Sequence, residues 1–343
     1  MLNARSYVYS MKFFSNFAPD VKETTLNHKM NDKIKGYALG AIAAATYGMN
    51  PLFALPLYSD GMDADSVLFF RYLFAIPLLG AMIKFRGRSF KVTGKETLLL
   101  IFMGLMVALS SLTLFLSYNY MDAGIASTLL FVYPILVALI MTLVYKEKIS
   151  LLTAFCILVA VGGISLLYHT EGGGTLNLVG TLLVFGSAIT YAIYIVGVNR
   201  SSLKDVATLA VTFYVLLFGV LLFFARLVMG DGITLPTKWY LWGNLLALAV
   251  FPTAISFLCT TSAIKYIGST PTAILGALEP VTAVVIGVTV FDEAFTLREG
   301  VGLVMIIVAV TLVIAGGNIS QHMVRWRKLF PRLPLKLHIP HKH

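Results

Sequence analysis

The stretch YMDAGIASTLLFVYPILVALIMTLVYKEK at residues 120–148 lies without a gap over YIGSTPTAILGALEPVTAVVIGVTVFDEA at residues 266–294. Identical residues coincide at Tyr120/Tyr266, Leu129/Leu275, Pro134/Pro280, Ile140/Ile286, Val144/Val290 and Glu147/Glu293. In both copies an apolar run of membrane-spanning length carries a proline in its middle and ends in charged residues. The chain therefore contains an internal repeat, and this repeat decides the fold.

The repeat extends toward the amino terminus of each copy. GYALGAIAAATYGMN (36–50) lies over GTLLVFGSAITYAIY (180–194), so that Thr46 and Tyr47 meet Thr190 and Tyr191. In the next apolar run SVLFFRYLF (66–74) lies over AVTFYVLLF (210–218), and there Arg71 meets a valine. One register, with a slip of two residues, covers most of each half.

The composition favours a lipid environment. The chain is 58% hydrophobic and only 12% charged, whereas soluble domains are about one quarter charged. Apolar runs of about 20 residues predict ten transmembrane helices, at 36–57, 66–84, 96–118, 122–144, 149–168, 177–198, 205–229, 239–263, 269–291 and 297–317. We expect an all-α integral membrane protein with five-helix repeats at 36–168 and 177–317, a polar cytoplasmic segment at 1–35 and a basic cytoplasmic tail at 318–343.

The net charge of +10 reports orientation and argues against a nucleic-acid partner. With the amino terminus in the cytoplasm, 22 of the 26 Lys and Arg residues fall in the head, the inner loops and the tail. The loop KFRGRSFKVTGK (84–95) then faces inward and YSDGMDAD (58–65) faces outward. This is the positive-inside pattern, and it predicts a multi-pass protein of the cell (inner or plasma) membrane with both termini cytoplasmic.

An odd number of helices in each repeat makes the second copy enter the membrane from the opposite side. The two repeats are then inverted, related by a pseudo-two-fold axis in the membrane plane. Many secondary transporters obtain two mirror-related states from such repeats, one open to each side of a central site. The repeat therefore predicts a central cavity between the halves and transport by alternating access.

Other functional classes lack their motifs. GKET at 94–97 has no upstream glycine of a phosphate-binding loop, and none of the six histidines lies in a predicted span. Cys156 and Cys259, both inside spans, are interpreted as apolar packing residues. We therefore expect no catalytic activity, no cofactor and no metal site.

The order of these features resembles the EamA family of the drug/metabolite transporter superfamily. The resemblance covers about residues 36–317 and rests on the tyrosine-bearing first helix of each half, FRYLFA (70–75), the Tyr-Pro and Glu-Pro pairs, and the ends YKEK and FDEA. It implies a ten-helix fold, a central cavity lined by both halves, and export or exchange of small metabolites, often amino acids. It does not supply the substrate.

Glu279 is the most deeply placed charge of the predicted spans, and its repeat partner is Tyr133. Each is followed by a proline, Pro134 or Pro280, which frees the carbonyls of Leu130 and Gly276. Freed carbonyls at that depth need protein or water beside them, so these helix breaks should line the cavity. Glu279 contacts substrate or titrates as a proton carrier, or else it is a structural carboxylate bonded to a neighbouring helix.

Arg71 lies only about 7–8 Å into its predicted helix. We expect its guanidinium to reach the outer headgroups, or to pair with a helix end or an outer acid. The alternative is a residue at the mouth of the cavity that attracts substrate carboxylates.

Further polar residues at helical spacing could bind substrate or only bond neighbouring helices. Candidates for substrate binding are Thr46, Tyr47, Asn50, Thr190, Tyr191 and Tyr194. Thr253, Ser256, Thr260 and Thr261 are interpreted as bonds between helices. Glu147 and Glu293 end the fourth and ninth predicted spans, in opposite leaflets, and are predicted to form a gate or helix-end ion pairs.

The predicted function is a secondary active transporter, an exporter of a small metabolite such as an amino acid, with proton coupling as a hypothesis. Two alternatives stay open: an exchanger of larger anions such as nucleotide sugars or sugar phosphates, and a non-transporting membrane subunit. The sequence leaves open the substrate, the oligomeric state and the start at Met1, Met11 or Met30.

Overall fold

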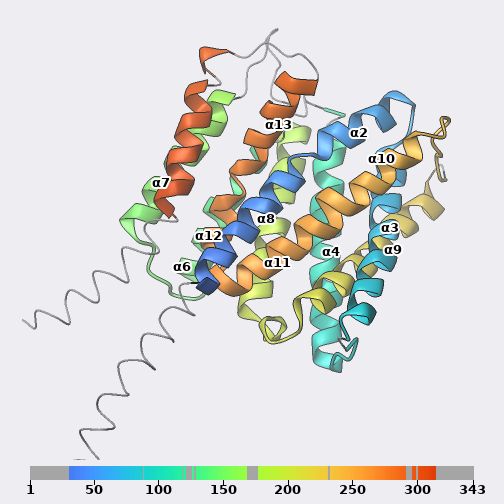
Figure 1. The fold of residues 1–343 in the computed structure, drawn as a ribbon, viewed down its shortest axis with the longest axis horizontal. Helices are drawn as coiled ribbons and strands as arrows, with labels where there is room; N and C mark the ends of the chain where they lie inside the picture. Colours follow the sequence, from blue (N-terminus) through green and yellow to red (C-terminus); the bar gives the residue numbers. More distant parts are fainter. Residues whose placement is uncertain are drawn as a thin grey trace, which may run out of the picture.

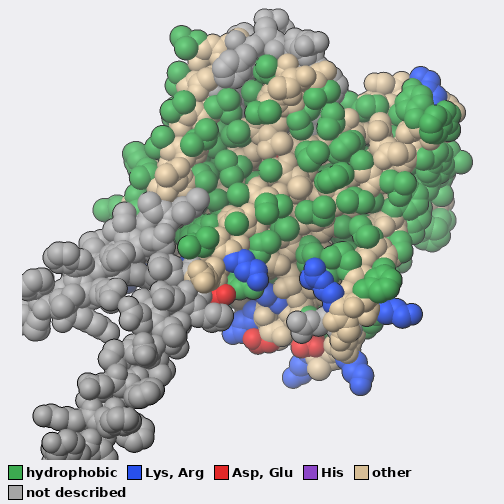
Figure 2. All heavy atoms as spheres, viewed as in Figure 1, with side chains coloured by type: hydrophobic (Ala, Val, Ile, Leu, Met, Phe, Trp, Pro, Cys, Tyr) green, Lys and Arg blue, Asp and Glu red, His purple; other side chains and the backbone are tan. Residues whose placement is uncertain are grey.

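The computed structural model describes residues 31–313 except 88, 118, 121–125, 127–128, 168–176, 231, 291–295 and 299. Within this part of the chain seven helices are long and apolar enough to cross a membrane, and three shorter apolar helices accompany them. Hydrophobic side chains cover the middle of the molecule, while Lys and Arg gather at one end (Figure 2). The protein is a multi-pass membrane protein.

The first half contributes a helix over residues 31–47, then α2 (Asn50–Ser59), α3 (Ala64–Phe85), α4 (Gly94–Ser117), α6 (Tyr133–Leu143) and α7 (Leu151–Leu167). The second half contributes α8 (Leu178–Arg200), η1 (Ser202–Lys204), α9 (Thr208–Met229), α10 (Leu241–Leu248), η2 (Ala249–Ile255), α11 (Ser256–Ile267), α12 (Ser269–Leu275), α13 (Leu278–Val290) and a helix at Gly300–Val313.

Most predicted spans agree with these helices to within a few residues. The described part of the first span starts at Asn31, and residues 31–35 of the predicted polar segment already belong to that helix. The last charged residues of that segment continue the helix, which hydropathy alone does not register. The eighth span runs over Leu241–Ile267 instead of 239–263. The tail at 318–343 and Glu293 lie outside the described residues.

Several spans are interrupted near a proline. The first span turns at Gly48–Met49 before α2, and α6 starts at Tyr133 with Pro134 in its first turn. The ninth span turns at Gly276–Ala277, between α12 and α13. In the eighth span the helix widens over η2, which contains Pro252. Proline cannot donate to the preceding turn, which accounts for these four interruptions, although α3 continues as one helix across Pro77.

The halves pack against each other along α4, α8, α9 and α3. α8 lies in the centre, with α7 and α13 on one side of it and α3, α9 and α10 on the other (Figure 1). The crossing of α4 and α9 is close: a Cβ added at Gly104 would stand 2.7 Å from the carbonyl oxygen of Val215. Only a residue without a side chain allows that approach.

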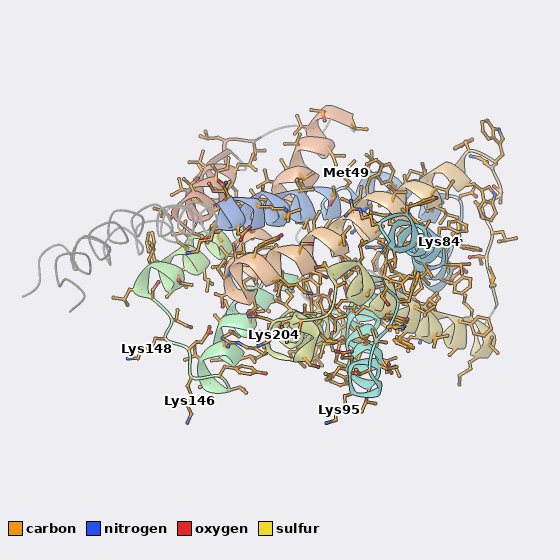
Figure 3. The ribbon with its side chains drawn as sticks, turned by 60° about the horizontal axis from the view of Figure 1, so that its bottom comes forward. Met49, Lys84, Lys95, Lys146, Lys148 and Lys204 are labelled. Carbon is orange, nitrogen blue, oxygen red and sulfur yellow. The ribbon has the colours of Figure 1, made fainter. Side chains whose placement is uncertain are left out.

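One end of the molecule carries Lys95, Lys146, Lys148 and Lys204 (Figure 3); we call it the basic end. The elements that bear Lys95 and Lys204, α4 and η1, contact each other. Near this end Glu147, from the first half, forms an ion pair with Arg200 at the close of α8. The prediction of a helix-end ion pair for Glu147 is confirmed.

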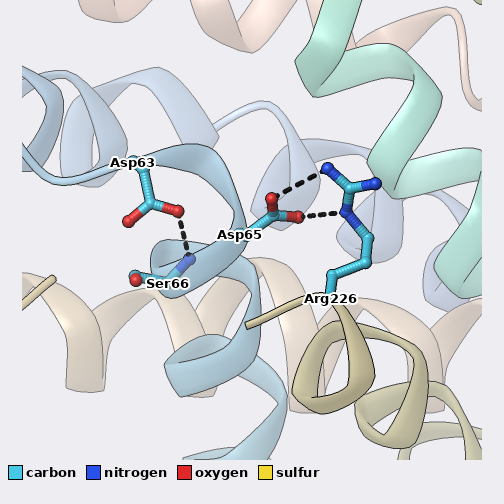
Figure 4. A network of polar contacts seen from close by, with 4 residues as sticks. All are labelled: Asp63, Asp65, Ser66 and Arg226. Atoms are coloured by element: carbon cyan, nitrogen blue, oxygen red, sulfur yellow. Dashed lines mark hydrogen bonds and ion pairs between the residues drawn. The ribbon is translucent and has the colours of Figure 1, made fainter. Parts of the chain in front are cut away.

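At the opposite end, the far end, the loop between α2 and α3 meets the loop between α9 and α10. Asp65 accepts two hydrogen bonds from Arg226, at 2.8 and 3.0 Å (Figure 4). Asp63 accepts hydrogen bonds from Ser66 and Thr234. Burial alone would raise the pKa of the Asp63 carboxyl, but these hydrogen bonds outweigh it and hold that pKa below its usual value.

Candidate functional site

A small pocket lies where the break in the first span meets the turn between α12 and α13. Its lining comes from both halves: Gly40, Ala43, Ala44, Tyr47, Tyr133, Tyr191, Ile195, Ser256, Thr260, Thr272, Gly276 and Glu279. Glu279 is the only ionisable carboxylate in this lining. The space open to a water-sized sphere is about 20 Å³, which suits about one water molecule and no metabolite. We call it the central pocket.

Aromatic rings form one wall of the central pocket. The ring of Tyr191 meets Tyr133 edge to face, with centroids 5.0 Å apart, and lies 6.1 Å from the ring of Tyr194 in a stacked arrangement. Phe257 continues the row, 6.2 Å from Tyr194 and 6.5 Å from Tyr47. Such rings present apolar faces together with polar hydroxyl groups. Tyr47, Tyr133 and Tyr191 of this row line the pocket, so a ligand that entered a wider form of it would meet both apolar faces and hydroxyl groups.

The Tyr133 hydroxyl links the two broken spans. It donates to the carbonyl oxygen of Ala273 at 3.1 Å, near the end of α12. The prediction that Pro280 leaves the Gly276 carbonyl free is wrong, because that carbonyl accepts the backbone N–H of Glu279 at 2.9 Å. A tight turn replaces the missing helical bond. The expected helix break and its position beside the pocket are present.

Arg71 does not reach the membrane surface. Its side chain is fully buried, Nε donates to Thr253 Oγ1 at 2.6 Å, and Nη2 donates to the Pro252 carbonyl at 3.1 Å. The predicted placement among the outer headgroups is wrong, because the widened helix at η2 offers polar acceptors inside the protein. Its guanidinium carbon lies 5.5 Å from the centre of the Tyr47 ring, just behind the central pocket.

The other predicted residues divide into two groups. Tyr47, Tyr133 and Tyr191 line the central pocket with Glu279, whereas Tyr194, Thr46, Thr190 and Asn50 do not. Thr46 and Thr190 donate to carbonyls of their own helices, and Tyr194 shares a hydrogen bond with Thr261 at 3.1 Å. Buried hydroxyl groups satisfied in this way serve helix structure. The amide oxygen of Asn50 is buried and has no hydrogen-bond partner among the described residues.

Sequence reasoning missed several lining residues. Ser256 and Thr260, interpreted as bonds between helices, line the central pocket with Thr272. Ser256 also donates to the Ala43 carbonyl at 2.9 Å. The same residue therefore bonds a neighbouring helix and lines the central pocket. Ser256 and Thr260 are four residues apart and follow Pro252, so they lie on one face of a helix near its break. This spacing could have identified them as lining residues.

Comparison with known proteins identifies the class. A model of the EamA-like transporter family matches residues 34–169 and 178–315, once in each half. An uncharacterized transporter of Clostridium kluyveri is 24% identical over 288 residues, 80% of this chain and 91% of its own length. The uncharacterized transporter YcbK of Bacillus subtilis is 22% identical over 299 residues, 81% of this chain and 90% of its own.

A solved crystal structure shares the fold. It superposes with a TM-score of 0.70 at 16% identity, over 84% of this chain and 98% of that chain. The two family matches cover the two repeats read from the sequence, and together they span most of the chain. This protein belongs to the EamA-like transporter family.

Proposed function

We propose that the protein is a secondary active transporter that exports a small metabolite, such as an amino acid, by alternating access. The observation that carries this proposal is a partly buried carboxylate, Glu279, in a pocket built from broken helices of both halves. Ionisable groups at membrane depth mark substrate or ion pathways, and interrupted helices of two repeats form the binding sites of many secondary transporters.

The geometry of the two ends supports alternating access. The first half is tied to the second through Asp65 and Arg226 at the far end and through Glu147 and Arg200 near the basic end. The central pocket between them holds about one water molecule. This arrangement suits a closed state from which the halves part at one end while contact persists at the other. The contacts at the two ends pair loops that an inverted topology places on the same side.

Glu279 is the residue proposed to couple transport to protons. It is the only carboxylate among the residues that line the central pocket, and a carboxylate can carry a proton or release it. A carboxylate that binds a proton in one state and releases it in the other would let the proton gradient drive export. Glu279→Gln removes the titration and keeps the side-chain shape.

Two experiments test the function. Metabolite profiling of cells and medium, with and without overexpression, should show one small metabolite in excess outside; unchanged profiles would contradict export. In liposomes the Glu279→Gln protein should equilibrate that metabolite without accumulating it against a gradient. Accumulation equal to the wild type would refute proton coupling through Glu279.

A labelling experiment tests the inverted topology. Single cysteines placed at Lys95 and Lys204, in a Cys156→Ala/Cys259→Ala background, should both be protected from a membrane-impermeant reagent added outside. A cysteine at Thr237 should react. Reaction of only one of the two lysine positions would place the loops on different faces and exclude the inverted arrangement.

A further inference from the structure

The guanidinium of Arg71 has one nitrogen without a partner. Nε and Nη2 donate to Thr253 and to the Pro252 carbonyl, whereas Nη1 is buried and makes no hydrogen bond among the described residues. A guanidinium carries five N–H groups, two of them on Nη1. Buried polar groups are nearly always paired, and charged donors above all. The fully buried Nη1 group of Arg71 should therefore be paired with a hydrogen-bond acceptor in another state of the protein.

The Tyr47 side chain also interacts with this guanidinium, but no described residue meets Nη1 at hydrogen-bond geometry. Arg71 forms no ion pair within the part of the chain that the structure describes, and its influence on Glu279 acts without a hydrogen bond. The two bonds that it does form hold the guanidinium against η2 and fix its orientation. The hydrogen bonds of Nε and Nη2 thus fix the position of Nη1 and leave its own N–H groups available, which is the arrangement expected of a ligand-binding group.

Tyr47 stands between this nitrogen and the central pocket. Its ring lies against the guanidinium, 5.5 Å from it, and the same residue lines the pocket beside Glu279. The helix turns directly after it, at Gly48–Met49, and Gly48 packs against the Glu279 backbone, where a Cβ would stand 2.8 Å from Thr282 Cβ. A movement of this turn that displaces the Tyr47 ring would join the guanidinium and the carboxylate in one chamber.

We propose that Nη1 of Arg71 is the carboxylate-binding subsite of the transport site, closed off by Tyr47 in this state. The ligand class is a small molecule with a free carboxylate, which a guanidinium binds through charge-assisted hydrogen bonds. The unpaired amide oxygen of Asn50, one turn beyond Tyr47, offers an acceptor on the same helix break. The proposal rests on the proposed function, because it assigns the transported molecule a carboxylate.

Ligand binding to the full-length protein in lipid nanodiscs tests this subsite without a flux assay. The probes are the twenty L-α-amino acids, acetate, lactate and succinate, each beside its amide. Binding is measured as the concentration-dependent rise of the thermal unfolding midpoint. At least one carboxylate should stabilise the wild type, and its amide should bind about 10–100-fold more weakly, the worth of one charge-assisted hydrogen bond.

Variants separate binding from structure. Arg71→Met should lose about 10–100-fold in affinity, and Arg71→Lys should recover part of it as a point charge without the bidentate geometry. Ser110→Ala is the control: it removes a buried hydroxyl that bonds Ser187 and does not line the central pocket, and it should stay within about threefold of the wild type. The comparison of acid and amide on the wild type needs no variant, so a poorly folded Arg71→Met protein leaves the test intact.

Three results would overturn the subsite: equal binding of acid and amide, an equal loss in Ser110→Ala and Arg71→Met, or no stabilisation by any carboxylate. The outcome separates from that of the proposed function. Export of a metabolite without a carboxylate would remove the subsite and leave transport standing. Carboxylate binding that depends on Arg71, in a protein that transports no metabolite, would support the subsite and contradict the proposed transport function.

Discussion

The substitution Gly276→Ala should change the stability of the protein through two opposing effects, backbone preference and steric overlap. Gly276 ends α12 with φ −54° and ψ −22°, a helical conformation that alanine adopts more readily than glycine, by about 0.5–1 kcal/mol. A Cβ at this position would overlap the Tyr133 hydroxyl, however, and would stand 3.0 Å from the Ala273 carbonyl oxygen. The backbone favours the substitution and the packing opposes it.

The steric overlap should outweigh the backbone preference, so that the substitution destabilises the protein. Overfilling a well-packed site costs about 1–3 kcal/mol, and displacing Tyr133 also breaks its hydrogen bond to Ala273, worth about 1 kcal/mol. After the gain from alanine, a net loss of about 1–3 kcal/mol remains. Tyr133→Phe alone should cost about 1 kcal/mol, because the Ala273 carbonyl keeps the N–H of Gly276 as a second donor.

The double variant Tyr133→Phe/Gly276→Ala gives the sharpest result. Removing the hydroxyl relieves the main overlap, so the double variant should be more stable than Gly276→Ala by about 1 kcal/mol. Non-additivity of this sign arises only if the two groups compete for the same space.

Unfolding midpoints of the purified full-length protein measure the series in one detergent. Gly186→Ala in α8 is the matched control, since nothing lies within 4 Å of a Cβ there, and it should equal or exceed the wild type. A Gly276→Ala protein as stable as that control, or a double variant less stable than Gly276→Ala, would refute the packing of Tyr133 against this turn.

Three further predictions concern the remaining contacts between the halves. Asp65→Asn and Arg226→Met should each lower the unfolding midpoint by an amount corresponding to at most about 1 kcal/mol, because the pair is partly exposed, and combining them should add little; fully additive losses would contradict a direct pair. The depressed pKa of Asp63 means that its contribution is present above the ordinary aspartate pKa of about 3.9 and is lost as the pH falls through the lower folded value. Asp63→Asn should therefore unfold earlier than the wild type at pH 7 and alike at pH 2, and a constant difference would contradict this. Gly104→Ala should cost about 1–3 kcal/mol, since the Cβ would meet the backbone of α9 at 2.7 Å, and a midpoint equal to the wild type would show a looser crossing.

The helices and their breaks were readable from the sequence because hydropathy and proline act locally. Lipid demands apolar runs of about 20 residues, and Pro134 and Pro280 break their spans wherever the rest of the chain goes. The repeat then brought Tyr133 and Glu279 to equivalent positions, and both line the central pocket. Spacing alone was not sufficient, however, because Thr46, Thr190, Tyr194 and Asn50 were chosen by the same criterion and do not line this pocket.

The environment of Arg71 was not readable, because it depends on another helix. Counting residues from the predicted helix start gave a shallow depth, and a long side chain at that depth can reach water. The acceptors that keep it inside belong to Thr253 and Pro252, more than 180 residues away in the chain. Hydropathy records that a span is apolar, and it carries no information about which carbonyls a widened helix exposes.

The two halves share the same order of helices but differ in the charged residues that they place near the central pocket. The counterpart of Arg71 is Val215, fully buried where α9 crosses α4, and its carbonyl oxygen lies where a side chain at Gly104 would stand. Burying a guanidinium at that crossing would require additional space and hydrogen-bond acceptors, a cost that valine does not incur. The charged groups near the central pocket therefore come one from each half, the guanidinium from α3 and the carboxylate of Glu279 from α13. A movement of one half against the other changes the distance between them. Because two opposite charges in a low dielectric attract strongly at short range, the approach of the halves and the charge state of the site are coupled, whichever end opens first.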